Sequence, residues 1–118
     1  MQPRQPFLRS DRVKELLKEQ IAELLLREVE FDGALVTVID VEVTKKLDYA
    51  NVKFAVIPTQ ESERILKLLN ARLPYLQSVL QRKIEIKPMP TLSFEIDKGA
   101  EKAAAIEKAL LDEERKNG

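Results

Sequence analysis

The sequence predicts an α+β domain in which helices cover one face of a three-stranded sheet. Apolar residues first recur at the spacing of a helix, alternate as in strands from residue 35, and return to helical spacing after residue 58. Proline and glycine stand where the spacing changes. At 118 residues, the chain is long enough for one domain with a substantial core.

The first helix is expected to be amphipathic. Ser10 or Asp11 can cap its start, and Phe31-Asp32-Gly33 ends it because Gly33 can adopt a positive φ. Residues 1–9 contain two prolines and no periodicity, so they are expected to form a flexible basic arm. The apolar residues that share the core face of this helix are Val13, Leu16, Leu17, Ile21, Leu24, Leu25 and Val29.

Two alternating segments predict an antiparallel hairpin. Pro58 ends the second strand because proline has no N–H to donate to a ladder. The first strand is expected to place on one face Leu35, Thr37, Ile39, Val41 and Val43, and on the other Val36, Val38, Asp40 and Glu42. The second strand is expected to place Asn51 and Lys53 on one face and, on the other, Ala50, Val52, Phe54 and Val56.

Two short helices are predicted next, with a break between them. Thr59 or Ser62 opens the first, which is expected to run to about Ala71. Pro74 lacks an N–H and disfavours helical angles at Leu73. The helix is therefore expected to break or kink at Pro74 and to restart there.

The last strand is expected within residues 84–97, on either side of Pro88-Met89-Pro90. It completes an antiparallel sheet of three strands. Residues 10–98 then form one domain, and residues 99–118 form a C-terminal helix and tail.

Charge is segregated although the chain is neutral overall. Residues 64–88 carry six basic side chains and one acid, and residues 1–18 carry five bases and two acids. Residues 19–63 carry four bases and ten acids. Such an arrangement orients a protein in the field of a nucleic acid. The alternative for any single run is an ordinary solvated face.

Cysteine and histidine are absent, which excludes disulfides, thiolate nucleophiles, imidazole bases and the usual zinc ligands. Asp40 and Glu42 share a strand face, but nothing completes a catalytic pair, and we interpret them as solvated. We expect no enzyme, no metal and no cofactor. Without a membrane-spanning run or a secretory signal, we expect a cytoplasmic protein.

The order helix, strand, strand, helix, helix, strand is the topology of a type II KH domain, and residues 10–98 resemble the ribosome-binding factor A family. The segments that carry the resemblance include Val36-Thr37-Val38-Ile39-Asp40-Val41-Glu42-Val43-Thr44, Leu47-Asp48-Tyr49-Ala50-Asn51-Val52-Lys53-Phe54 and Pro90-Thr91-Leu92-Ser93-Phe94-Glu95-Ile96-Asp97. One departure is Arg72-Leu73-Pro74, where the family usually has a glycine in third place. No glycine lies between the middle helices to form the KH clamp on single-stranded RNA.

The resemblance implies a monomeric assembly factor that binds the immature 30S ribosomal subunit and assists late maturation of its 16S rRNA. Ribosomal proteins or an assembly GTPase are further candidate partners, and no membrane is involved. The candidate RNA contacts are Arg64, Lys67, Arg72, Arg82, Lys83, Lys87, Arg9, Arg12, Lys45 and Lys46, with Pro74 shaping the bend.

Two alternatives stay open from the residues. The chain can be a KH-like RNA-binding protein outside ribosome assembly, or a protein-interaction module. The apolar stripe that supports the second alternative consists of Ala103, Ile106, Ala109 and Leu110. Likewise, Lys45 and Lys46 can belong to an ordinary charged turn, and the arm of residues 1–9 can be a disordered terminus without an RNA contact.

Overall fold

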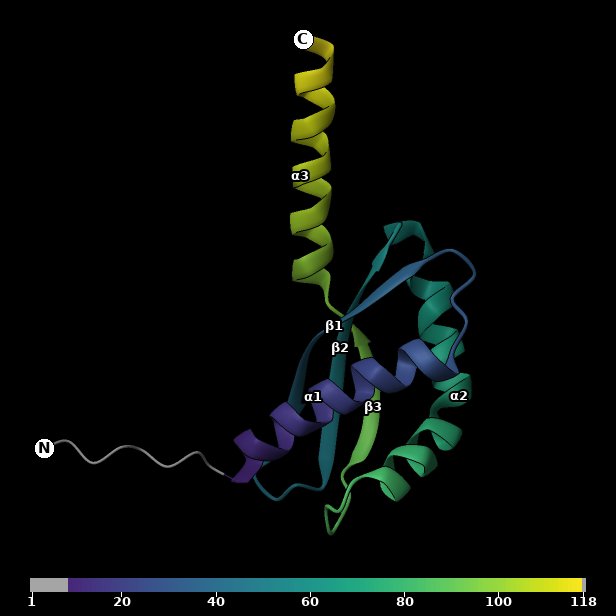
Figure 1. Cartoon of the computed structure of the whole chain (residues 1–118). Helices are drawn as coiled ribbons and strands as arrows, with labels where there is room; N and C mark the ends of the chain where they lie inside the picture. The colour runs from purple at the N-terminus through teal and green to yellow at the C-terminus, as the bar shows by residue number, and fades with distance from the viewer. Residues whose placement is uncertain (1–8, 118) are drawn as a thin grey trace, which may run out of the picture.

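Residues 9–117, which this computed structural model describes, fold into three α-helices, one 3-10 helix and a three-stranded sheet. The elements in chain order are α1 (Arg9–Glu28), β1 (Leu35–Val43), β2 (Tyr49–Ile57), η1 (Thr59–Glu61), α2 (Ser62–Lys83), β3 (Thr91–Ile96) and α3 (Lys98–Asn117). Helices α1 and α2 cover one face of the sheet, whereas α3 projects away from it (Figure 1). Apart from Arg9, which opens α1, the predicted N-terminal arm lies outside the described residues.

The predicted α+β, KH-like class is confirmed, but the sheet is mixed. The strand order is β1-β2-β3, with β1 antiparallel and β3 parallel to β2. The expectation of an antiparallel sheet is wrong because the chain crosses the covered face through α2 before it forms β3, and such a crossover returns a strand in the same direction. The last strand is also shorter than residues 84–97, since it begins at Thr91.

The two predicted middle helices are one continuous helix, α2, with Pro74 inside it. Buried side chains hold it to the core on both sides of the proline, because Leu69 and Leu76 are 0% and 1% exposed. The carbonyl that Pro74 leaves without a helical donor is that of Asn70, on the exposed side of the helix, where water can serve it. The ribbon of α2 bends instead of breaking (Figure 1).

The core lies between the sheet and the two covering helices. The predicted common face of β2 is buried, and six of the seven predicted core positions of the first helix are buried, five within α1 and Val29 directly after it, with Leu16 left 37% exposed. Phe54 and Phe94 meet edge to face, with ring centroids 6.3 Å apart. Each fully buried large apolar side chain stabilises the fold by about 1.5–3 kcal/mol.

Strand β1 contains a one-residue bulge. Val38 pairs with Phe54 and Asp40 with Lys53, which leaves Ile39 as the extra residue. The predicted common face of residues 35, 37, 39, 41 and 43 is therefore wrong in the first half of the strand, where Leu35 is 59% exposed. The β1 residues that face the core are Val36 and Val38 before the bulge and Val41 and Val43 after it.

Gln77 of α2 pairs with the free edge of β3. Its Nε2 donates to the Pro90 carbonyl at 2.8 Å, and its Oε1 accepts from the Leu92 N–H at 2.8 Å. The side-chain amide thus makes the two hydrogen bonds that a neighbouring strand would make. It fixes the start of β3 against α2.

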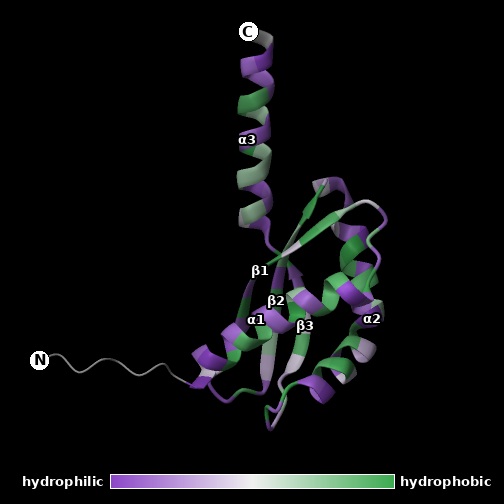
Figure 2. Ribbon diagram, in the orientation of Figure 1, coloured by the Kyte–Doolittle hydropathy of each residue, from purple (hydrophilic) through white to green (hydrophobic). Residues whose placement is uncertain are grey.

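Among the residues that the structure describes, the side-chain hydrogen bonds that anchor helix α3 lie at its beginning. The Asp97 carboxylate accepts from the Ala100 N–H at 3.0 Å, and the Ser62 hydroxyl donates to the Glu101 carboxylate. Further along, Ile106 and Leu110 are 57% and 58% exposed. Apolar and polar residues alternate along the whole projecting helix (Figure 2). No helix among the described residues is long and apolar enough to cross a membrane.

Replacing Gln77 with alanine should lower the free energy of unfolding by about 1–3 kcal/mol, because a buried carbonyl and N–H lose their partner. Urea denaturation measures the loss. The matched control is Gln81→Ala, an exposed residue of the same helix, which should change stability by less than about 0.5 kcal/mol. Equal losses in the two variants would show that the edge contact contributes nothing.

Candidate nucleic-acid interface

Four segments that carry cations meet at one end of the molecule. They are the start of α1, the β1–β2 turn, the last turn of α2 and the segment that leads into β3 (Figure 1). An Arg9 guanidinium nitrogen donates to the Lys87 carbonyl at 3.3 Å, and the Thr91 N–H donates to the Asp48 carbonyl at 2.9 Å. We call this surface the basic end and define it by Arg9, Arg12, Lys45, Lys46, Arg82, Lys83 and Lys87, all of which are exposed.

The turn that carries Lys45 and Lys46 is held by the Thr44 hydroxyl. This group donates to the Asp48 carboxylate at 2.5 Å and accepts the N–H groups of Asp48 and Tyr49, each at 3.2 Å. The hydrogen bond from Thr44 lowers the pKa of Asp48. Leu47, at 4% exposure, anchors the turn in the core. Both lysines are thus left outside on a fixed backbone.

The cations after α2 are held in a similar way. Ile84 and Ile86 are 8% and 9% exposed, and they pin the segment that follows the helix to the core. The side chains of Lys83 and Lys87 therefore lie on the outside of an anchored segment, with the single acid Glu85 between them. Arg82 and Lys83 also sit at the negative end of the α2 dipole, which favours positive charge there.

Arg64 and Lys67 lie far from the basic end. They belong to the first turns of α2, and Arg64 is about 27 Å along the helix from Arg82 at 1.5 Å per residue. Arg64 is also committed within the chain, because its Nε lies 2.9 Å from a Glu61 carboxylate oxygen and its Nη2 donates to the Phe31 carbonyl at 3.0 Å. The predicted RNA contacts on α2 are therefore divided between the two ends of this helix.

Arg72 joins α2 to the end of α1. Its Nη2 donates to the Glu28 carbonyl at 3.1 Å, and its guanidinium carbon lies 5.4 Å from the centroid of the Tyr75 ring. The Tyr75 hydroxyl donates to the Glu28 carboxylate at 3.3 Å. These contacts give Arg72 a packing role at a helix C-terminus, where positive charge is favourable.

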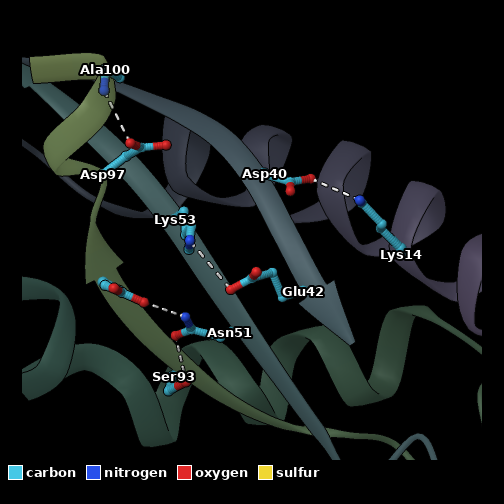
Figure 3. Close-up of polar contacts among 9 residues, drawn as sticks. Lys14, Asp40, Glu42, Asn51, Lys53, Ser93, Asp97 and Ala100 are labelled. Atoms are coloured by element: carbon cyan, nitrogen blue, oxygen red, sulfur yellow. Dashed lines mark hydrogen bonds and ion pairs between the residues drawn. The ribbon is translucent and has the colours of Figure 1, made fainter. Parts of the chain in front are cut away.

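The acids interpreted from the sequence as solvated are partly exposed, and each forms an ion pair. Asp40 lies 3.2 Å from the Lys14 ammonium, and Glu42 lies 3.4 Å from the Lys53 ammonium, whose pKa the charge of Glu42 raises (Figure 3). Partial burial raises the pKa of Asp40, but the hydrogen bond and charge of Lys14 outweigh it, so this pKa lies below its ordinary value. Lys14 is thereby neutralised and adds no net charge to the basic end.

Polar side chains gather in the middle of the sheet face that α1 and α2 leave open, whereas exposed Leu35 and Ile57 pair at one end of it. Asn51 donates to a Glu95 carboxylate oxygen at 2.6 Å and accepts from the Ser93 hydroxyl at 2.8 Å (Figure 3). These groups satisfy one another, and within residues 9–117 no three acids gather into a group that could hold a metal ion.

Sequence reasoning did not single out Tyr49, which is 60% exposed beside the basic end. The sequence signal that could have found it is the alternation of side chains along β2. Tyr49 precedes the buried position Ala50 and shares the open face with Asn51. Sequence reasoning also missed Gln77, for which the sequence carries no signal.

Comparisons with known proteins agree on one family. The family model described as ribosome-binding factor A matches residues 9–110. Ribosome-binding factor A of Akkermansia muciniphila is 35% identical over 88% of this chain and 83% of its own length. That of Thermodesulfovibrio yellowstonii is 34% identical over 92% of each chain. The crystal structure of ribosome-binding factor A from Thermus thermophilus superimposes with a TM-score of 0.66, at 24% identity, over 74% of this chain and 93% of that one.

The Lys14–Asp40 pair should make stability depend on pH in the acid range. Because the folded-state pKa of Asp40 is lowered, its contribution is complete above the ordinary value of about 3.9 and is lost as pH falls through the lowered pKa. Urea unfolding at pH 6 and pH 3 should therefore show a smaller acid loss for Asp40→Asn than for the unchanged chain. Lys14→Met should reduce the acid loss as well, and an undiminished loss in both variants would refute the assignment.

Proposed function

Because this chain belongs to the ribosome-binding factor A family, we propose that it binds the immature 30S ribosomal subunit and assists late maturation of its 16S rRNA. The observation that carries the mode of binding is the basic end, where four separate segments present cations on anchored backbone. It acts by binding, as a monomer in the cytoplasm, and not by catalysis.

Binding through the basic end is driven by contacts with phosphates. Lysine and arginine that neutralise phosphates release condensed counterions, which favours association and makes it depend steeply on salt. Such contacts set position and orientation without reading sequence. The anchors at Leu47, Ile84 and Ile86 limit the side-chain and backbone freedom that binding must remove.

In this proposal the chain does not bind RNA through the clamp that typical KH domains close on a single strand. That clamp needs a flexible loop between two helices whose backbone can approach the nucleotide backbone. Here residues 62–83 form one helix without glycine, and its N–H groups are used within the helix. The proposed ligand surface is therefore folded rRNA, which is recognised by charge and shape.

A role of α3 in protein contacts is the second candidate function. Its exposed apolar side chains Ile106, Leu110 and Leu111, each more than half exposed, favour this role. They lie on the projecting helix, away from the basic end (Figure 1).

Charge reversal can distinguish binding through the basic end from a general effect of the protein's net charge. The double variant Arg82→Glu, Lys83→Glu should weaken binding to purified immature 30S subunits at least about tenfold, and it should lower the slope of log Kd against log salt by about 2. Sedimentation with the particles at several salt concentrations measures both. The control Lys102→Glu, Lys108→Glu makes the same change of charge on α3 and should bind normally. If the two double variants bind alike, the basic end is not the interface.

The contribution of α3 is tested with an uncharged double variant, Ile106→Gln, Leu110→Gln. Both side chains are exposed, and glutamine is a good helix former, so α3 should persist. Binding to immature 30S subunits should stay within about twofold of the unchanged chain, since a twofold change is only about 0.4 kcal/mol. A loss as large as that of the Arg82, Lys83 variant would favour docking through α3.

A further inference from the structure

An exposed aromatic ring stands next to the cations of the basic end. Tyr49 is the first residue of β2, directly after the turn that carries Lys45 and Lys46, and it is 60% exposed. Since the next residue, Ala50, is fully buried, the Tyr49 side chain points to the open face of the sheet. A large aromatic side chain is therefore exposed to solvent at a position that would accept a polar residue.

Tyr49 differs from the other aromatic residues of the described chain. Phe54 and Phe94 are buried in contact with each other, and Phe31 packs against the core. Tyr75 is held by Arg72 and Glu28. Within residues 9–117, no hydrogen bond or ring contact engages the side chain of Tyr49.

The neighbours of Tyr49 leave its ring uncovered and its backbone fixed. Its partner in register on β3 is Thr91, and the next residue on its face is Asn51, both too small to cover an aromatic ring. Its N–H donates to the Thr44 hydroxyl at 3.2 Å, and its carbonyl accepts from the Thr44 N–H at 3.1 Å. The ring is thus carried by a rigid strand end and not by a mobile loop.

We propose that Tyr49 is a stacking site for one unpaired base of the bound rRNA, with Lys45 and Lys46 against the flanking phosphates. This inference rests on the proposed function and adds the chemistry of the ligand to it. Base stacking on aromatic side chains tolerates any base, because every base has a π-face. The nearby carboxylate of Asp48 accepts a hydrogen bond from the Thr44 hydroxyl, which holds it within the turn. The basic end then takes up a single-stranded nucleotide beside folded RNA.

The test compares the affinity of Tyr49→Ala, Tyr49→Phe and the unchanged chain for immature 30S subunits over a range of salt. Tyr49→Ala should weaken binding roughly 5- to 150-fold, the range expected for loss of one stacked base. Its slope of log Kd against log salt should be unchanged, because the lost contact carries no charge. Tyr49→Phe keeps the ring and should bind within about twofold. Urea denaturation checks that Tyr49→Ala stays folded, as an exposed position allows.

The possible failures can be told apart. If Tyr49→Ala binds normally while Arg82→Glu, Lys83→Glu is impaired, the stacking site is wrong and the proposed function stands. If Tyr49→Phe loses as much as Tyr49→Ala, the hydroxyl and not the ring makes the contact, which also overturns stacking. If the unchanged chain does not bind the particles at all, the proposed function fails and the stacking site fails with it.

Discussion

The parallel pairing of β3 with β2 is the constraint on which the rest of the structure depends. Two parallel neighbours start at the same end of a sheet, so Tyr49 at the start of β2 lies in register with Thr91 at the start of β3. To reach that point from the far end of β2, the chain must cross the sheet, and α2 makes the crossing. The end of α2 and the β1–β2 turn are thereby brought to one end of the molecule (Figure 1). The basic end is a result of this topology.

The cations divide into those engaged in ion pairs or helix contacts and those at the basic end, where Arg9 also donates to the Lys87 carbonyl. Lys14, Arg64 and Arg72 are joined to Asp40, Glu61 and the Glu28 carbonyl, respectively. The cations at the basic end surround backbone that is tied down by buried Leu47, Ile84 and Ile86. A neutral chain can therefore present a cationic surface without accumulating net charge, because ten of its twenty acids lie between residues 19 and 63 and seven more lie between residues 89 and 118.

Local patterns predicted the elements well and their arrangement less well. The periodicity of α1 and β2 identified their buried faces, since each has one continuous contact with the core. The alternation of β1 looked regular although Ile39 is an inserted residue, because apolar residues occur on both sides of the bulge. Pro74 predicted a break or a kink, and the helix bends without breaking because buried contacts at Leu69 and Leu76 outweigh one lost hydrogen bond. For the site, the sequence showed which residues are basic, whereas the contact of Arg9 with Lys87 joins residues 78 positions apart and needed the fold.

The amide of Gln77 also affects how the molecule meets other chains. A free strand edge is a template on which another polypeptide can pair, and exposed edges are common sites of aggregation. At β3 the first such positions are already taken by Gln77, and at β1 the extra residue Ile39 interrupts the row of unpaired groups. Neither edge of the sheet presents a long, regular row of unpaired backbone N–H and C=O groups. Both free edges of the sheet are thereby less open to pairing with a strand of another chain.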